Sequence, residues 1–177
     1  MGRNIRFESF YRNKAEMKKI ALSGKKGNGK FALVDNSDYE YLNQFKWHIS
    51  SPGYPTRGIW SSQRKQNKLV NMHRELIKSE KGFEIDHING DKLDNRRSNL
   101  RIVTHKQNIA NQKLQSKSRS GYKGVSYYKN YKKWEAYICT NKKKYRLGYF
   151  ITKEEGALAY NQAAIKYFGE FARLNRI

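Results

Sequence analysis

From Lys19 to about residue 70 the chain shows short runs of alternating apolar and polar side chains, and this period of two predicts β-strands. The first twenty or so residues lack clear periodicity and are left unassigned. The expected elements are a strand from Lys19, a glycine-rich turn, a second strand, a short acidic helix from Asn36 or Ser37, a strand over 46–50, a turn over 51–53, more strand and a short helix around 73–78. The glycine-rich turn (KGNGK, 26–30) is followed by Phe31, where a phosphate-binding loop needs Ser or Thr. We therefore expect a hairpin turn there.

A new pattern begins near residue 83 and predicts a strand, a loop, a strand and a helix. The expected elements are a short apolar strand over 83–85 that ends at Asp86 and His87, a loop rich in Asn, Asp and Gly, and a second strand over 100–103. Thr104 followed by Gln107 is a capping box. It predicts a helix that carries Asn108 in its first turn.

The polar segment over 112–120 has the composition of a linker, and the pattern after it predicts three strands and one helix. The strands are expected at 124–127, 134–140 and 145–150. A second capping box, Thr152 with Glu155, opens the helix, and Gly169 can end it. The apolar stripe of this helix consists of Ala157, Tyr160, Ala164, Tyr167 and Phe168.

Charge is the feature of the composition that indicates a partner. The 177 residues include 37 Lys and Arg against 15 Asp and Glu, and the formal charge of +22 favours a polyanionic partner, nucleic acid first. No apolar run is long enough to span a membrane or to serve as a secretory signal. We therefore expect no membrane partner and a cytoplasmic protein that is not secreted, in the host cytoplasm if a phage encodes it. The single cysteine, Cys139, is expected to be a small buried strand residue.

Three residues of the segment after 83 suit phosphodiester hydrolysis. Asp86 offers a carboxylate oxygen and Asn108 an amide oxygen, which are hard ligands suited to one Mg²⁺-like ion that keeps waters. His87 beside them can act as a general base on a water molecule. An Asp-His pair alone is usually a solvated turn, so the interpretation depends on the surrounding spacing.

That spacing resembles the HNH endonuclease family, in the group seen in phage and intron homing endonucleases. The matching residues are Asp86-His87-Ile-Asn-Gly90-Asp, Asp94-Asn95-Arg96, Ser98-Asn99-Leu100-Arg101 and the stretch from Thr104 to Asn108. The resemblance implies that Asp86 and Asn108 bind the metal, that His87 activates water, and that Asn99 orients His87 by holding the loop. Many members have histidine as the last ligand. Asn108 in its place favours one Mg²⁺, or Mn²⁺, over zinc.

The other basic residues of this segment have two interpretations each. Arg96, Arg97 and Arg101 are either a solvated face or phosphate contacts, and the nuclease setting favours phosphate. His73 is expected in a structural role, in the core or on the substrate side. His48 and His105 are expected to be packed or solvated rather than catalytic.

The segment over 121–177 resembles the APETALA-two/ethylene-response-factor (AP2/ERF) DNA-binding domain of plants, which also occurs appended to phage HNH nucleases. The matching residues are Tyr122-Lys-Gly124-Val125, Lys133-Trp134-Glu-Ala136, Leu147-Gly148-Tyr-Phe150, Glu154-Glu155-x-Ala157-x-Ala159-Tyr160 and Ala172-Arg-Leu174-Asn175. The resemblance implies that the sheet enters the major groove. The implied DNA contacts are Lys123, Tyr128, Lys132, Trp134, Lys144 and Arg146.

Several positions depart from the plant domains. Arginines of those domains are replaced here by Lys123, Ser126, Tyr128 and Cys139, and a glutamate by Tyr137. Serine and tyrosine cannot pair with guanine as arginine does, so the plant target sequence does not carry over. A basic sheet that binds the DNA backbone without sequence preference is the alternative.

The sequence thus predicts an α+β protein: a ββα-metal HNH module, and a three-stranded antiparallel sheet on one helix. A β-rich region and nuclease module over 1–111, with its core at about 83–113, would precede a linker over 112–120 and a DNA-binding module over 121–177. The predicted activity is metal-dependent nicking or double-strand cutting of duplex DNA by a monomer or a DNA-assembled dimer, with residues 1–116 alone still able to nick. The alternatives are a DNA-binding regulator with a non-catalytic HNH scaffold and an RNA-binding or ribosomal-type protein.

Overall fold

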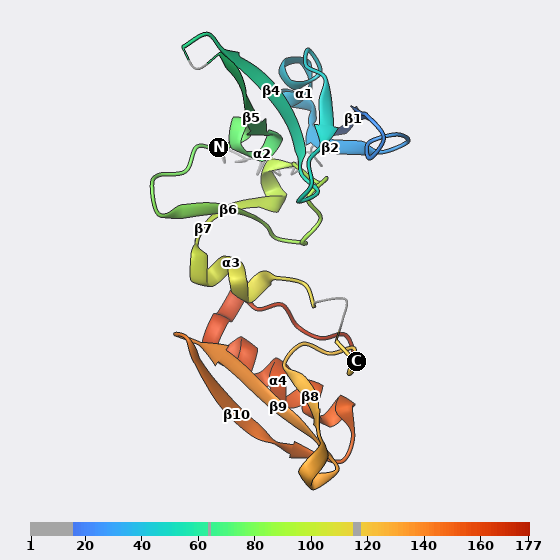
Figure 1. Cartoon of the computed structure of the whole chain (residues 1–177), viewed down its shortest axis with the longest axis vertical. Coiled ribbons are helices and arrows are strands. Elements are labelled where there is room, and N and C mark those ends of the chain that lie inside the picture. Colours follow the sequence, from blue (N-terminus) through green and yellow to red (C-terminus); the bar gives the residue numbers. More distant parts are fainter. Residues whose placement is uncertain (1–15, 64, 115–117) are drawn as a thin grey trace, which may run out of the picture. The chain divides into compact units, whose positions relative to one another are not determined.

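A computed structural model describes residues 16–63, 65–114 and 118–177, and these residues form two compact units (Figure 1). The described residues up to Leu76, together with Lys92–Ser98, make the N-terminal unit. Ile77–Asp91 and Asn99–Ile177 make the C-terminal unit. The predicted mixture of α and β structure, with several sheets and few helices, is confirmed. Lys92–Ser98, in the loop of the ββα segment, thus belong to the N-terminal unit, whereas the rest of that segment belongs to the C-terminal unit. The linker expected at 112–120 stays a prediction, and its residues 115–117 lie outside the described residues.

The N-terminal unit is built on a five-stranded sheet. Its strands are β1 (Met17–Ser23), β2 (Phe31–Asp35), β3 (Trp47–Ile49), β4 (Pro55–Ser61) and β5 (Gln66–Asn71), and its helices are α1 (Asn36–Leu42) and α2 (Met72–Leu76). The strand order is β2-β1-β3-β4-β5, with β1 and β3 parallel and the other neighbours antiparallel. Ile20 and Leu22 alternate with exposed residues of β1 and are buried, as are Leu42 of α1 and Trp47 of β3. The apolar positions of the predicted alternating pattern therefore form part of the core of this unit.

Residues 92–98 lie against the edge strand β2. Leu33 donates its amide to Leu93 O at 2.8 Å and accepts from the Asn95 amide at 2.8 Å. The Asp35 carboxylate at the start of α1 accepts the backbone amide of Arg97 at 2.7 Å. These bonds fix the middle of the predicted nuclease loop to the sheet of the N-terminal unit.

The first half of the C-terminal unit is a hairpin followed by a short helix. β6 (Phe83–His87) pairs antiparallel with β7 (Leu100–Thr104), and the one-turn helix η1 (Arg97–Asn99) precedes β7. α3 (His105–Asn111) begins at the capping box predicted from Thr104 and Gln107, which is confirmed with both reciprocal bonds present. The chain therefore has strand, loop, strand and helix in the expected order.

The second half of the C-terminal unit is a three-stranded antiparallel sheet with one helix packed against it. The elements are β8 (Val125–Tyr128), η2 (Lys129–Tyr131), β9 (Lys133–Thr140), β10 (Lys143–Phe150), α4 (Lys153–Phe168) and η3 (Gly169–Phe171), with strand order β10-β9-β8. Ala136 and Ile138 of β9 are buried, as are Tyr160 and Ala164 of α4. The capping box of Thr152 and Glu155 is confirmed.

Gly124 shows why this packing is close. Its φ is +72°, and a Cβ at this position would collide with the Tyr160 ring and the Tyr137 carbonyl oxygen. Glycine is therefore required before β8 both for its backbone conformation and for the approach of α4.

Two expectations for the C-terminal unit are wrong. Cys139 is exposed, because alternate residues of β9 face opposite sides and the neighbouring Ile138 takes the buried side. Tyr167, expected in the packing stripe of α4, is 44% exposed and stacks on Tyr145 of β10, with ring centroids 6.1 Å apart. Within the described ranges, no helix is long and apolar enough to cross a membrane.

Candidate active site

Asp86 is held from both sides at the end of β6. It lies opposite Arg101 of β7, and its Oδ2 accepts Arg101 Nε and Nη2, both at 3.0 Å. The Asn111 amide nitrogen donates to both carboxylate oxygens of Asp86, at 3.1 and 3.0 Å. The carboxylate is buried, so both contacts keep it oriented where water alone could not.

Asn111 is a site residue that the sequence analysis missed. It is the last residue of α3 and is buried, and its amide nitrogen also lies 3.0 Å from His87 O and 3.3 Å from Ile88 O. One side chain thus joins the carboxylate of Asp86 to the backbone that follows it. The signal in the sequence was the spacing of three residues from Asn108, which puts the two amides one turn apart on the helix.

His87 is the last residue of β6, and it is buried. Its carbonyl accepts the Gly90 amide at 2.8 Å, so the chain turns tightly after it. Asn99 closes this turn, because its Oδ1 accepts the Asn89 amide at 3.0 Å and its carbonyl accepts the Ile88 amide at 2.9 Å. Asn99 therefore bonds to the loop backbone next to His87.

Asn108 of α3 lies beside Glu84 of β6 and bonds to it. Its amide nitrogen donates to Glu84 Oε2, while His105 Nδ1 lies 2.8 Å from Glu84 Oε1. Glu84 and Asp86 are two residues apart on one strand, so their side chains share a face of the hairpin. Asn108 thus bonds to the strand that carries Asp86, and Asn111 is the amide in contact with Asp86. A metal site of Asp86 and Asn108 stays a prediction.

The donors on this face suit a hard cation. Among the residues that the structure describes, no group of three or more His, Cys, Asp and Glu side chains could hold a metal ion. A cation here would be bound by the Asp86 carboxylate and an amide oxygen, with water and phosphate completing its shell. Oxygen donors of this kind suit hard divalent cations, whereas structural zinc sites are built mainly from Cys and His.

The segment after α4 contacts the same hairpin within the C-terminal unit. Arg101 Nη1 donates to Glu170 O at 3.2 Å, and its guanidinium lies 4.4 Å from the centre of the Phe171 ring. Arg173 Nη1 donates to Asn89 O at 2.9 Å, in the loop after His87. We name residues 170–173 the C-terminal clamp, because they fix both the partner of Asp86 and the loop that follows it.

The three arginines expected on phosphate are each paired inside the chain. Arg96 forms a bidentate pair with both oxygens of Asp94, and Arg97 does the same with Asp38. Arg101 donates through two nitrogens to one oxygen of Asp86. Bidentate pairs with carboxylates hold the guanidinium in a fixed orientation. The structure thus gives each arginine a role in holding the fold, and phosphate contact stays a prediction.

The side chains expected on DNA in the sheet differ in availability. Lys144 Nζ and Arg146 Nε share the buried Glu135, at 2.8 and 2.7 Å. Burial alone would raise the pKa of Glu135, but the hydrogen bonds and charges of these two cations outweigh burial and lower that pKa. Lys132 is exposed, whereas Tyr128 and Trp134 are half-buried and contact other tyrosine rings.

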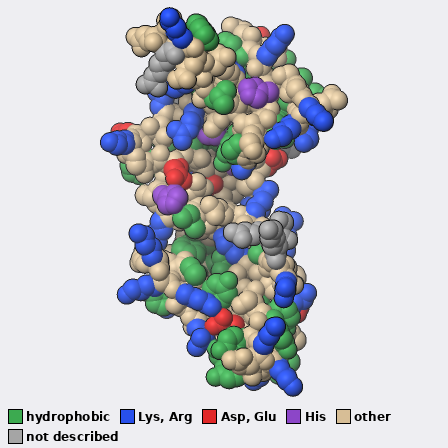
Figure 2. All heavy atoms as spheres, viewed as in Figure 1, with side chains coloured by type: hydrophobic (Ala, Val, Ile, Leu, Met, Phe, Trp, Pro, Cys, Tyr) green, Lys and Arg blue, Asp and Glu red, His purple; other side chains and the backbone are tan. Residues whose placement is uncertain are grey.

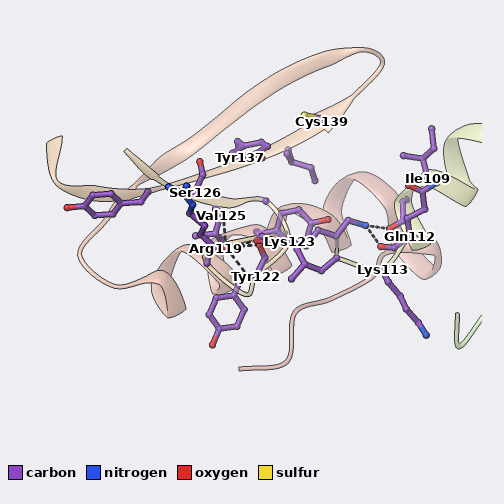
Figure 3. A pocket seen from close by; sticks show the side chains of 18 of the residues that line it. Ile109, Gln112, Lys113, Arg119, Tyr122, Lys123, Val125, Ser126, Tyr137 and Cys139 are labelled. Carbon is purple, nitrogen blue, oxygen red and sulfur yellow. Dashed lines mark hydrogen bonds between the residues drawn. The ribbon is translucent and has the colours of Figure 1, made fainter. Parts of the chain in front are cut away.

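Lys123 points into the C-terminal unit rather than toward solvent. It lines a cavity of about 670 Å³, and its Nζ donates to Ala110 O at 2.6 Å and Gln112 O at 2.9 Å, at the end of α3 (Figure 3). Burial, with repulsion from Arg173, lowers the pKa of Lys123 to about 8. A lysine at a helix C-terminus satisfies carbonyls that have no partner within the helix.

The histidines outside the pair have the structural surroundings expected of them. His73 of α2 is buried, and its ring meets Tyr54 edge-on with centroids 4.9 Å apart. His48 is half-buried in β3, and His105 is exposed at the start of α3.

Comparison with known proteins gives matches to nucleases and to viral proteins. A family model described as HNH endonuclease matches residues 78–110. An uncharacterized HNH endonuclease of Acanthamoeba polyphaga mimivirus is 32% identical over 152 residues, which cover 86% of this chain and 78% of the relative. Protein 3.8 of Escherichia phage T7 is 32% identical over 93 residues, which cover 52% of this chain and 76% of the relative. No solved structure matches.

Proposed function

The chain belongs to the HNH endonuclease family, and from this premise we propose that it is a metal-dependent endonuclease that hydrolyses phosphodiester bonds of duplex DNA. The observation that carries the proposal is the buried pair of Asp86 and His87 at the end of β6. Asn111 holds the carboxylate of this pair, and Asn99 holds the turn after it. Burying charged and titratable groups costs free energy, so they are buried where the surroundings orient them.

His87 is the proposed general base. Its imidazole would take a proton from the water that attacks phosphorus, and the bond to the 3′ oxygen would break. The released 3′ oxygen would take a proton from solvent, which leaves a 5′-phosphate and a 3′-hydroxyl. Asn99 acts as a positioning residue, because its bond to the Asn89 amide fixes the turn that carries His87.

Asp86 and Asn108 are the proposed ligands of one divalent cation, Mg²⁺ or Mn²⁺. When bound, such an ion neutralises charge that develops on the phosphate and the leaving oxygen. Asn111 keeps the Asp86 carboxylate in place, and Arg101 neutralises it from the other side. The amide oxygen of Asn108 is a suitable donor because its nitrogen is the atom that bonds to Glu84.

The proposed DNA contacts extend beyond the reacting group. In the AP2/ERF-like sheet, Lys132 and Trp134 contact DNA together with Tyr128. Lys144 and Arg146 each bond to Glu135, but their side chains are 49% and 58% exposed, so their remaining N–H groups can contact phosphate while those bonds are kept. Many Lys and Arg side chains and few acidic ones appear on the face shown in Figure 2, which supports a polyanion as the partner.

Supercoiled plasmid with and without Mg²⁺ tests the proposal. Wild type should relax or linearise the plasmid only with the cation, and His87→Ala should bind the same DNA without cutting it. Relaxed circles indicate nicking by one site, and linear products at early times indicate paired sites. Absence of cation-dependent cutting by wild type, with binding intact, would instead support the DNA-binding regulator with a non-catalytic HNH scaffold.

A further inference from the structure

The outer part of β4 and β5 is a two-stranded ribbon in the N-terminal unit. β3 pairs with β4 only at Pro55 and Thr56, whereas β4 and β5 pair along their whole length, from Thr56 with Asn71 to Ser61 with Gln66. In the described residues, 57–61 and 66–70 therefore have no third strand beside them, and we name them the ribbon. It reaches away from the rest of its sheet (Figure 1, green). Such a ribbon gains little stability from its own pairing.

The ribbon exposes large apolar side chains on one face. Trp60 is 63% exposed and Leu69 is 62% exposed. Leu69 pairs with Gly58, and Trp60 pairs with Asn67, so both apolar side chains lie on the same face with no side chain at Gly58 between them. Apolar side chains gathered on an exposed element indicate a surface for a partner.

The charge of this part of the chain identifies the partner. Residues 55–74 contain five Lys and Arg and no Asp or Glu. Arg57 at the base of the ribbon is held by Glu75 at 2.7 Å, whereas Lys68 near its middle is exposed. Apart from Glu75, which neutralises Arg57 at its base, this surface has apolar, amide and cationic side chains, and such a surface complements a polyanion such as nucleic acid.

The dimensions of the ribbon favour duplex DNA. The major groove admits a two-stranded ribbon, and five strand residues span roughly 17 Å, enough to cross it. Asn67 shares a face with Trp60, and Gln66 shares the other face with Lys68, and amides of this kind can pair with adenine edges.

We propose that the ribbon is a DNA-binding surface of the N-terminal unit that enters the major groove, with Trp60 and Leu69 against bases and sugars and Lys68 on a phosphate. The inference rests on the proposed function, because that function makes duplex DNA the substrate. It adds a second region of DNA contact, separate from the sheet of the C-terminal unit. The DNA sequence would then be selected by contacts with the ribbon as well as by contacts with the C-terminal sheet.

Binding without cleavage tests the proposal. In the full chain carrying His87→Ala, Trp60→Ala should weaken binding to a labelled 30-base-pair duplex by about tenfold. Lys68→Gln should also weaken binding and reduce the slope of log K against log salt by about one. The matched controls are Met17→Ala, which replaces a 54% exposed side chain of β1, and Lys25→Gln in an exposed turn, and both should bind like the parent.

The outcomes separate this inference from the proposed function. If the parent binds the duplex and the Trp60 and Lys68 variants bind equally well with equal salt slopes, the ribbon proposal is overturned while the nuclease proposal stands. If Trp60→Ala abolishes self-association in sedimentation but leaves DNA affinity unchanged, the ribbon contacts a second copy of the chain and the proposal is also overturned. If the parent does not bind duplex DNA at all, the proposed function itself fails.

Discussion

Replacing Arg101 by methionine should loosen the hairpin that carries Asp86. Methionine keeps the apolar stem of the side chain but removes the two bonds to Asp86 Oδ2, the bond to Glu170 O and the stacking on Phe171. Asp86 would then keep its bonds to the amide of Asn111. The carboxylate would be left buried without its counter-charge.

The structure sets the size of this effect. The side chains of Arg101 and Asp86 are 14% and 8% exposed, so water screens the pair little. Removing one partner of a buried pair costs about 3–5 kcal/mol, and the remaining Asn111 bonds place this case near ~3 kcal/mol. A loss of about 3 kcal/mol corresponds to roughly 150-fold faster exchange of amides that open with the hairpin.

Hydrogen exchange of peptides covering 83–111 measures the loss locally. Mg²⁺ should slow exchange more in Arg101→Met than in wild type, because a cation on Asp86 would replace the missing positive charge. The double variant Asp86→Asn/Arg101→Met removes both charges and should recover most of the protection without responding to Mg²⁺. Exchange in Arg101→Met within about threefold of wild type, the range of a surface ion pair, would refute the reasoning.

Two further predictions concern the rest of the C-terminal unit. The pKa of Lys123 is lowered from 10.5 to about 8, so between these values the unfolded chain binds a proton that the folded chain has lost. The free energy of unfolding of the wild type should therefore rise with pH across this window. Lys123→Met should remove that rise in parallel urea titrations at pH 7 to 10. Equal slopes of unfolding free energy against pH in both proteins would contradict this prediction. The C-terminal clamp revises the expectation that residues 1–116 nick DNA independently. At saturating DNA this fragment should nick at least tenfold more slowly than the full chain. Phe171→Ala in the full chain should show a smaller loss of nicking rate, because only the stacking on Arg101 is removed. Equal rates at saturation would show that the clamp does not support the site.

Local signals in the sequence predicted local structure well. Both capping boxes mark the first residue of a helix, because the bonds of a box join residues only three apart. The period of two also located the strands, but it did not decide which face of β9 is buried. Cys139 was assigned to the wrong face for this reason, since a residue's type alone does not fix its side of a sheet.

Contacts between distant residues account for what the sequence did not predict. The sequence shows Arg97 next to Arg96 as a basic cluster, but its partner Asp38 is 59 residues away. Arg101 likewise meets Glu170 O at a separation of 69 residues. The parallel pairing of β1 with β3 also has no local signal. The helical spacing from Asn108 could have indicated Asn111 as a second amide on the same face of α3. Its contact with Asp86, however, depends on how α3 packs on the hairpin.

The ion pairs described above also change what the charge of +22 means for recognition. Arg57, Arg96, Arg97, Arg101 and Arg146 each face a carboxylate of their own chain. Arginine is the cation whose planar fork distinguishes guanine, and in these five residues part of that fork is bonded to a carboxylate. The exposed positive charge is therefore rich in lysine, which holds phosphate as a point charge without reading bases. Discrimination between DNA sequences would then depend less on guanine contacts than on how readily each sequence adopts the bound shape.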